Sequence, residues 1–165
     1  MSRTIHTEPL TAEAFAPYGD VLDARGAPDK IINQGKCGRY HDRALVDAGP
    51  ATGGRVGMSI FHAELRTFPY ALDLIERHPE GSQAFVPMSA DPFLVIVADR
   101  PDATPRAFVT DGAQAINFHR GTWHGVLTPL AGNGLFAVVD RIGDTANLEE
   151  HFFDTPWQVL SGGAE

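Results

Sequence analysis

The stretch Glu76–Pro87 (ERHPEGSQAFVP) decides the fold, together with a second polar segment, His119–Gly125 (HRGTWHG). Four side chains in these segments can bind metals or transfer protons: Glu76, His78, Gln83 and His124. The first two stand two residues apart, and residues with that spacing on a β-strand point to the same side of it. The pattern predicts a polar site that faces the inside of a β-barrel, and such sites are usually functional.

The strand predicted over residues 71–78 changes character along one face. Its even positions are apolar at first and polar afterwards: Leu72, Leu74, Glu76 and His78. A barrel strand has this pattern when it runs from a packed core toward the mouth of a cavity. The loop at 79–82 then turns the chain, so Gln83 is expected to begin the partner strand and to lie across from the polar end. A surface hairpin with a polar tip is the alternative.

Short strands separated by glycine and proline fill most of the remaining chain. They are predicted at 55–65, 83–88, 93–98, 106–110, 115–118, 123–127 and 134–141. Many short strands with regular turn signals indicate a β-sandwich or a β-barrel, so the expected fold class is all-β. The segment Phe93–Ala98 is apolar on both faces, which predicts a central strand.

Helix is scarce in the predicted structure. Residues 11–16 predict one short N-terminal helix, capped by Thr11 and ended by the Pro-Tyr-Gly at 17–19. Residues 147–153 predict a further helical turn near the C-terminus. Residues 24–50 are rich in glycine and charge and have little apolar pattern. They predict a long loop, and long ordered loops in compact domains tend to carry function.

Length and composition fit one domain over residues 1–165. The formal charge of −8 argues against a nucleic-acid partner. No apolar run approaches the length of a membrane span, and the first residues lack the apolar core of a signal peptide. We therefore expect a cytoplasmic protein with no membrane partner. The single cysteine, Cys37, allows no intrachain disulfide and suits a reducing compartment.

The two polar segments resemble the motifs of the cupin superfamily, whose members form a conical jelly-roll barrel of the double-stranded β-helix type. The first motif has two His two residues apart and a Glu five residues after the second, where this chain has Glu76, His78 and Gln83. The second has a Gly three residues before a His, as at Gly121 and His124. A metal here would have one carboxylate, two imidazoles and at most one amide oxygen, a set that suits Ni, Zn, Mn or Fe.

Four motifs in one order are similar to those of the ureidoglycolate lyase family, also known as ureidoglycolate hydrolase. They lie at 32–42, 76–85, 119–124 and 139–141, and the similarity extends over residues 10–150. The resemblance implies a homodimeric cupin enzyme of allantoin breakdown that splits ureidoglycolate into glyoxylate and urea, with nickel as its cofactor. Many members have a second His where this chain has Gly125.

The chemistry of that reaction gives the candidate residues their roles. Elimination of urea needs a base for the hydroxyl proton and an acid for the departing nitrogen, and the catalytic candidates are His78, His124 and Glu76. The same three residues and Gln83 are the metal-ligand candidates. The substrate-binding candidates are Gln83, Arg39, Asn33 and His119. A guanidinium suits the substrate carboxylate and the side-chain amides suit the urea group, whereas His119 either reaches the site or stays on its loop.

Two other classes of function remain open. One is a different cupin enzyme, such as a metal-dependent dioxygenase or an epimerase, and the other is a non-catalytic cupin that binds a small ligand. A dioxygenase would consume oxygen at an open three-ligand iron site, and a binding module does not need a Glu and two His around one cavity. The ordered motifs favour the lyase. Its dimer contacts are expected on β surface that includes Trp123, Leu127 and Leu135.

Overall fold

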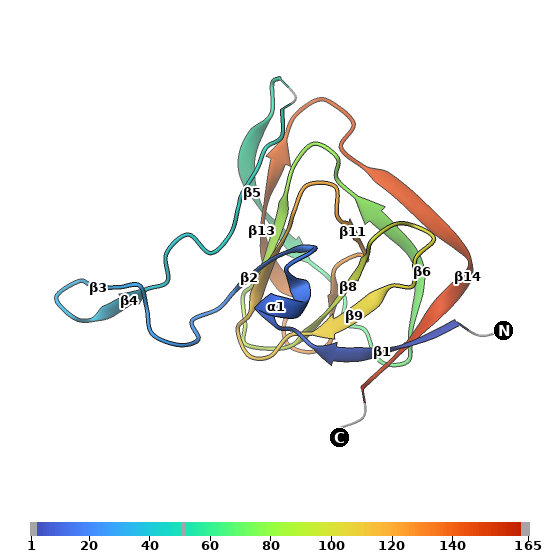
Figure 1. Cartoon of the computed structure of the whole chain (residues 1–165), viewed down its shortest axis with the longest axis horizontal. Coiled ribbons are helices and arrows are strands. Elements are labelled where there is room, and N and C mark those ends of the chain that lie inside the picture. The colour runs from blue at the N-terminus through green and yellow to red at the C-terminus, as the bar shows by residue number, and fades with distance from the viewer. Residues whose placement is uncertain (1–2, 51, 163–165) are drawn as a thin grey trace.

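A computed structural model of the chain describes residues 3–50 and 52–162. Almost all of its regular structure is β, in two large sheets and one small hairpin (Figure 1). The first sheet has the order β11 (Trp123–His124), β6 (Tyr70–Arg77), β14 (Glu149–Leu160), β1 (Arg3–Pro9), β9 (Arg106–Val109), β8 (Phe93–Ala98) and β12 (Thr128–Pro129). The second has the order β2 (Gly19–Leu22), β10 (Ala115–Phe118), β7 (Gln83–Pro87), β13 (Leu135–Ile142) and β5 (Arg55–His62).

The first sheet closes on itself. Strand β11 pairs with β6 on one side and with β8 on the other, so six strands form a closed barrel. Closure removes the unpaired edges that an open sheet leaves exposed. The prediction of an all-β, cupin-like barrel is therefore confirmed.

Two apolar clusters fill the structure. One joins the two sheets and is rich in aromatic rings, including Phe85, Phe93, Phe108, Phe118 and Phe136. The other is made by first-sheet residues, including Leu72, Ile75, Ile96 and Val159. Strand β8 supplies alternate residues to both clusters, and every one of its residues is buried. It pairs with β9 on one side and with β11 and β12 on the other, so the predicted central strand is confirmed.

The short N-terminal helix, α1 (Ala12–Phe15), also matches its sequence prediction. The hydroxyl of Thr11 accepts a hydrogen bond from the backbone N–H of Ala14, as a helix N-cap does. The second predicted helical turn is wrong, because strand β14 begins at Glu149. Its residues His151 and Phe152 pair with Ile75 and Leu74 of β6. Pairing with a neighbouring strand outweighs the weak local preference for helix in this segment.

Two further expectations about strands need correction. Gln83 does not begin a strand that pairs with β6, because β7 lies in the second sheet between β10 and β13. The loop at 78–82 therefore crosses from one sheet to the other and does not close a hairpin. Of the strand predicted at 123–127, only Trp123–His124 form a strand, β11. Gly125 then donates its backbone N–H to the carbonyl of Ile96, and β12 follows outside the predicted range.

Strand β6 departs from the uniform alternation that the sequence predicts. Its buried positions are Tyr70 and Leu72 at one end but Ile75 at the other, so the buried face changes from even to odd residues. The change coincides with an irregularity in the opposite strand, where the pairing of β14 shifts between Phe152 and Trp157. Such irregularities twist and bend strands locally. The result is that Glu76 leaves the apolar core of the first sheet.

The loop predicted at 24–50 contains a small hairpin of β3 (Lys30–Ile32) and β4 (Cys37–Arg39). Figure 1 shows this hairpin projecting well away from the two large sheets. We refer to residues 24–44 as the arm. Among the described strands, β3 and β4 pair only with each other. In the described part of the chain, no helix has the length and apolar character required to cross a bilayer.

A candidate metal centre

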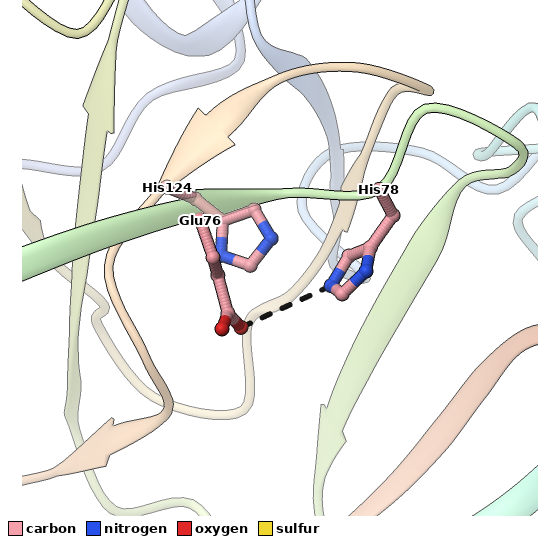
Figure 2. A group of neighbouring side chains, drawn as sticks. All are labelled: Glu76, His78 and His124. Carbon is pink, nitrogen blue, oxygen red and sulfur yellow. Dashed lines mark ion pairs between the residues drawn. The ribbon is translucent and has the colours of Figure 1, made fainter. Parts of the chain in front are cut away.

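Strand pairing brings Glu76 and His124 together. Strand β11 pairs antiparallel with β6, and in that register His124 lies directly opposite Glu76. His78 follows Glu76 by two residues, just beyond the end of β6. Figure 2 shows the three side chains pointing toward one another. A carboxylate oxygen and one nitrogen of each ring all lie within 4.8 Å of one another.

The hydrogen bonds of the two imidazoles fix which nitrogen carries the proton. Nδ1 of His124 lies 2.9 Å from the carbonyl oxygen of Gly125. Nδ1 of His78 lies 2.7 Å from the carbonyl oxygen of Asn147. Because a carbonyl only accepts, each Nδ1 donates, and each Nε2 is left with a free lone pair. Both Nε2 atoms are buried without a hydrogen-bond partner.

His124 is held in a dry environment. Its side chain is 1 % exposed, and its ring stacks on Phe118 with centroids 4.1 Å apart and planes 6° from parallel. Burial lowers the pKa of His124 to about 3, with His78 acting in the same direction and the bond to Gly125 opposing it. His124 is therefore neutral at every physiological pH, and its Nε2 lone pair is always available.

Glu76 is the only acidic group in the cluster. Burial raises its pKa, Glu150 adds to the effect, and His78 opposes it. Its oxygen Oε1 lies 3.9 Å from Nε2 of His78, which is too long for a hydrogen bond. Within the described residues, no lysine or arginine forms an ion pair with this carboxylate. The group is thus partly buried with little compensation for its charge.

These features together fit a divalent metal ion. Two unpartnered imidazole nitrogens and one undercompensated carboxylate are close enough to share one ion, and buried polar atoms normally have partners. Each imidazole also donates its other ring N–H to a backbone carbonyl, which is the outer support that metal-ligating histidines have. The residues Glu76, His78 and His124 therefore form a possible metal-binding triad.

Gln83 contributes to the wall of the same region. It lies opposite Phe118 and Asp140 in neighbouring antiparallel strands, and residues so paired point to the same face of a sheet. Phe118 is the ring that stacks on His124. The side-chain nitrogen of Gln83 donates to Asp140 at 3.1 Å, and its oxygen is buried without a partner. The free oxygen makes Gln83 available to a ligand.

The loop that carries His78 is held by residues that sequence reasoning missed. Asn147 accepts from His78 through its backbone carbonyl and from the N–H of Glu80 through its side chain. The carboxylate of Glu80 accepts from Thr145 and lies 3.2 Å from Nη1 of the buried Arg141. A backbone carbonyl has no sequence signature, so the contact that orients His78 could not have been found from residue types.

The other predicted site residues are not members of the triad. Nε2 of His119 is 3.0 Å from Oδ1 of Asp20. Arg77 faces away from the triad, as the alternation predicts, toward Glu149 and the ring of Trp123. Asn33 and Arg39 are on the arm, distant from the triad of their own chain (Figure 1).

Comparison with known proteins shows the family of the chain. The family model described as "Ureidoglycolate lyase" matches residues 2–160. The chain belongs to the ureidoglycolate lyase family. The ureidoglycolate lyase of Rhodobacter capsulatus is 54% identical over 155 residues, which cover 92% of this chain and 95% of the relative. That of a Chelativorans species is 47% identical over 161 residues, covering 95% and 96%. Ureidoglycolate lyase 2 of Rhizobium meliloti is 46% identical, covering 92% and 94%.

Proposed function

We propose that this protein is a ureidoglycolate lyase, which cleaves ureidoglycolate into glyoxylate and urea. The observation that carries the proposal is the triad of Glu76, His78 and His124, found in a chain of this family with two buried imidazole nitrogens free for a ligand. The reaction breaks the bond between the central carbon and a urea nitrogen while the hydroxyl of that carbon becomes a carbonyl. One proton leaves the hydroxyl and one joins the departing nitrogen.

The triad would hold a divalent cation through Nε2 of His78, Nε2 of His124 and the carboxylate of Glu76. Nickel is the ion that the family resemblance implies, and imidazole with carboxylate oxygen is a donor set that nickel accepts. When bound, such an ion supplies a Lewis acid that acidifies a substrate hydroxyl and makes its proton easier to remove.

The properties of His124 and Glu76 determine which of the two can transfer the protons. His124 is an unsuitable base, because a group whose pKa is about 3 does not retain a proton near neutrality. Glu76 has two oxygens, and one is enough to bind a cation. The other is free to accept the hydroxyl proton and to return it to the urea nitrogen. Its position 3.9 Å from Nε2 of His78 supports this role.

Gln83 is proposed to bind the urea group. Its side-chain nitrogen is held by Asp140, so its free oxygen is directed to accept a hydrogen bond from a urea N–H. Gln83→Ala is expected to raise KM about 10-fold or more and to change kcat little, because a contact made equally in the ground state and the transition state affects binding alone. Steady-state kinetics with Gln158→Ala as the matched control test this. An unchanged KM, or a loss of bound metal, contradicts the binding role.

The proposed reaction is tested directly by its products. Purified protein is incubated with ureidoglycolate, and glyoxylate, urea and ammonia are measured separately, before and after treatment with a chelator. Equal amounts of glyoxylate and urea are expected, with activity that falls after chelation and returns when Ni²⁺ is added back. Release of ammonia in place of urea would assign the protein to hydrolysis, and no glyoxylate at all would refute the proposal.

We further propose that the protein is a homodimer that pairs through the outer face of the second sheet. Strand β5 exposes Met58 and Ile60 to 75% and 61% of their surface, and β7, on the other side of β13, exposes Val86 to 37%. An exposed apolar sheet face of this kind marks an interface. The earlier candidates for dimer contacts fit less well, because Trp123 and Leu127 pack against the core clusters.

Met58→Glu is expected to shift the protein from dimer to monomer at micromolar concentration, because the substitution would bury a charge in the interface. Sedimentation velocity measures the change. Phe152→Glu is the control, since Phe152 is also exposed, at 64%, but lies on β14 in the other sheet. A wild-type protein that sediments as a monomer would contradict the proposal.

A further inference from the structure

We propose that the arm of each protomer completes the metal centre of its partner, and that Arg39 on this arm binds the carboxylate of the substrate. The inference rests on the proposed lyase function and on the proposed dimer. It assigns a role to a segment that neither the triad nor the core uses, and it makes each site dependent on two chains.

The first argument is that the triad lacks a cation of its own for the substrate carboxylate. Carboxylates in protein sites are usually held by arginine or by several N–H donors. Three arginines near the triad or the loop that supports it have other partners: Arg77 binds Glu149, Arg120 lies 3.5 Å from Asp47, and Arg141 pairs with Glu80. Glu76 forms no ion pair with any described lysine or arginine, so the site needs a positive group from outside.

The second argument is that hydrogen bonds and an ion pair brace the arm, although β3 and β4 form no part of the barrel. The hydroxyl of Tyr40 donates to the carbonyl of Gly26, and Asp29 accepts from the N–H of His41 and pairs with Arg43 at 2.8 Å. At the tip of the arm, Asn33 has a left-handed backbone with φ of 53°. Asparagine adopts this conformation readily, which suits the tight turn that joins β3 to β4.

The tip of this braced segment is nevertheless exposed. Arg39 and Asn33 are both exposed, and the apolar Ile31 is 57% exposed. Neither β3 nor β4 pairs with another described strand. Ordering a chain segment costs conformational entropy, and here no apolar burial in the same chain offsets that cost. Contact with a second molecule accounts for both the bracing and the exposure.

The third argument is charge. Residues 24–44 contain five Lys or Arg and two Asp, a net charge of +3, although the whole chain has a formal charge of −8. The remainder of the chain is therefore strongly acidic. A basic arm is attracted to an acidic body, and a second copy of this chain supplies such a body. The same charge favours the approach of an anionic substrate to the place where the arm docks.

The fourth argument is the direction of the arm. The triad lies near the end of the second sheet that is marked by Gln83 and Phe118. The chain leaves for the arm after Leu22, which pairs with Ala115 at the opposite end of strand β10. A two-fold axis that crosses the strands at right angles exchanges these ends between protomers. In Figure 1 the arm projects on the side of the molecule where β5 lies, which is the side of the proposed interface.

The decisive experiment is complementation between two defective chains. His124→Ala removes a triad residue and Arg39→Ala removes the arm cation, so each homodimer is expected to be inactive or nearly so. The two chains receive different affinity tags, are co-expressed, and are purified in tandem as mixed dimers. If the arm acts on its partner, one of the two sites contains neither substitution, and the mixed dimer is expected to recover about half of wild-type activity.

A mixed dimer of His124→Ala and Glu76→Gln chains is the matched negative control, because both of its triads are defective. Lys30→Ala tests whether loss of any arm charge has the same effect, and it is expected to retain most of the activity. Sedimentation confirms that Arg39→Ala is still dimeric. Mixed dimers no more active than either parent would overturn the proposal, since a cis arrangement or an uninvolved arm allows no recovery.

A second readout does not depend on turnover. Cys37, the single cysteine of the chain, lies on β4 two residues before Arg39. A photoreactive maleimide on Cys37 is expected to cross-link between protomers, to peptides around residues 76–83 of the partner. Mass spectrometry of dimers made from light and heavy chains separates these links from those within one chain. Cross-linking only within a chain, or to another surface, refutes the arrangement even if ureidoglycolate proves not to be the substrate.

Discussion

His124→Ala is expected to abolish cleavage of ureidoglycolate, with a loss in kcat/KM of at least about 10²–10⁴-fold, the range seen when a positioned catalytic group is removed. The bound metal is expected to fall with it. Nε2 of His124 is buried and has no other partner, and one nitrogen of its ring lies within 4.8 Å of the other two ligand atoms. No neighbouring imidazole can replace it, because His78 already belongs to the triad. Metal content and initial rates measure the two effects.

The alanine variant also tests the fold, because His124 is buried and does not lie at the solvent-exposed mouth of the barrel. The ring is 1 % exposed and stacks on Phe118, so its removal leaves a cavity. His124→Gln keeps more of the volume and separates loss of function from loss of structure. His6→Ala on β1 is the control for removing a histidine elsewhere. Near wild-type activity in both position-124 variants would rule out a role for His124.

The sequence predicts the triad well because its members are fixed by simple periodicities. The two-residue spacing of Glu76 and His78 and the Gly-x-x-His pattern at His124 are local features. The structure then brings them together by one antiparallel pair, in which His124 lies opposite Glu76. The apolar character of Phe93–Ala98 is equally local, and the strand it predicts is observed with the same bounds.

The sequence does not predict features that depend on distant partners. Strand β14 contains a segment with helical character, which becomes part of a strand because its residues Glu149–Phe152 pair with β6. Gln83 lies in the second sheet because the loop at 78–82 crosses between the two sheets. The spacing of residues along the sequence does not predict that crossing. The support of His78 comes from the backbone of Asn147, 69 residues away. In each case the structure depends on a contact between residues that are far apart in the sequence, and their residue types do not indicate that contact.

Glu76→Gln is expected to weaken metal binding by at least about 100-fold, more than is typical when only a supporting residue of a metal site is lost. The substitution keeps the size of the side chain but removes the negative charge that balances a divalent cation. Glutamine also lacks a second carboxylate oxygen, so turnover is expected to fall even when metal is supplied in excess. Isothermal titration with Ni²⁺ measures the affinity. Glu150→Gln is the control, since Glu150 is exposed and pairs with Glu76 across β14 and β6.

Glu76→Gln is also expected to make the metal-free protein more stable at neutral pH. Burial raises the pKa of Glu76 above that of an unfolded chain, with Glu150 adding to the shift and the neighbouring His78 opposing it. A raised pKa means that the folded state favours the protonated acid. The contribution of Glu76 to stability is therefore fully present at low pH and is lost as pH rises through the folded pKa. Glutamine resembles the protonated acid and avoids that decline. Buried His124 acts in the opposite direction, because its folded pKa of about 3 lies below the ordinary value of 6.5, so the stability of both proteins falls as pH drops below about 6.5. This contribution is the same in the wild type and the variant and cancels when they are compared at one pH.

Thermal unfolding between pH 4 and pH 8, first without metal and then with Ni²⁺, separates the effect of Glu76→Gln on the stability of the metal-free protein from its effect on metal binding. The variant and the wild type are expected to have similar Tm values at the acid end, and the variant is expected to be more stable at the alkaline end by a few degrees. With Ni²⁺ added, the order is expected to reverse near neutral pH, because an ion that binds only the folded protein raises its stability according to its affinity. A wild type that gains no stability from any divalent ion would show that the cluster of Glu76, His78 and His124 does not hold a metal.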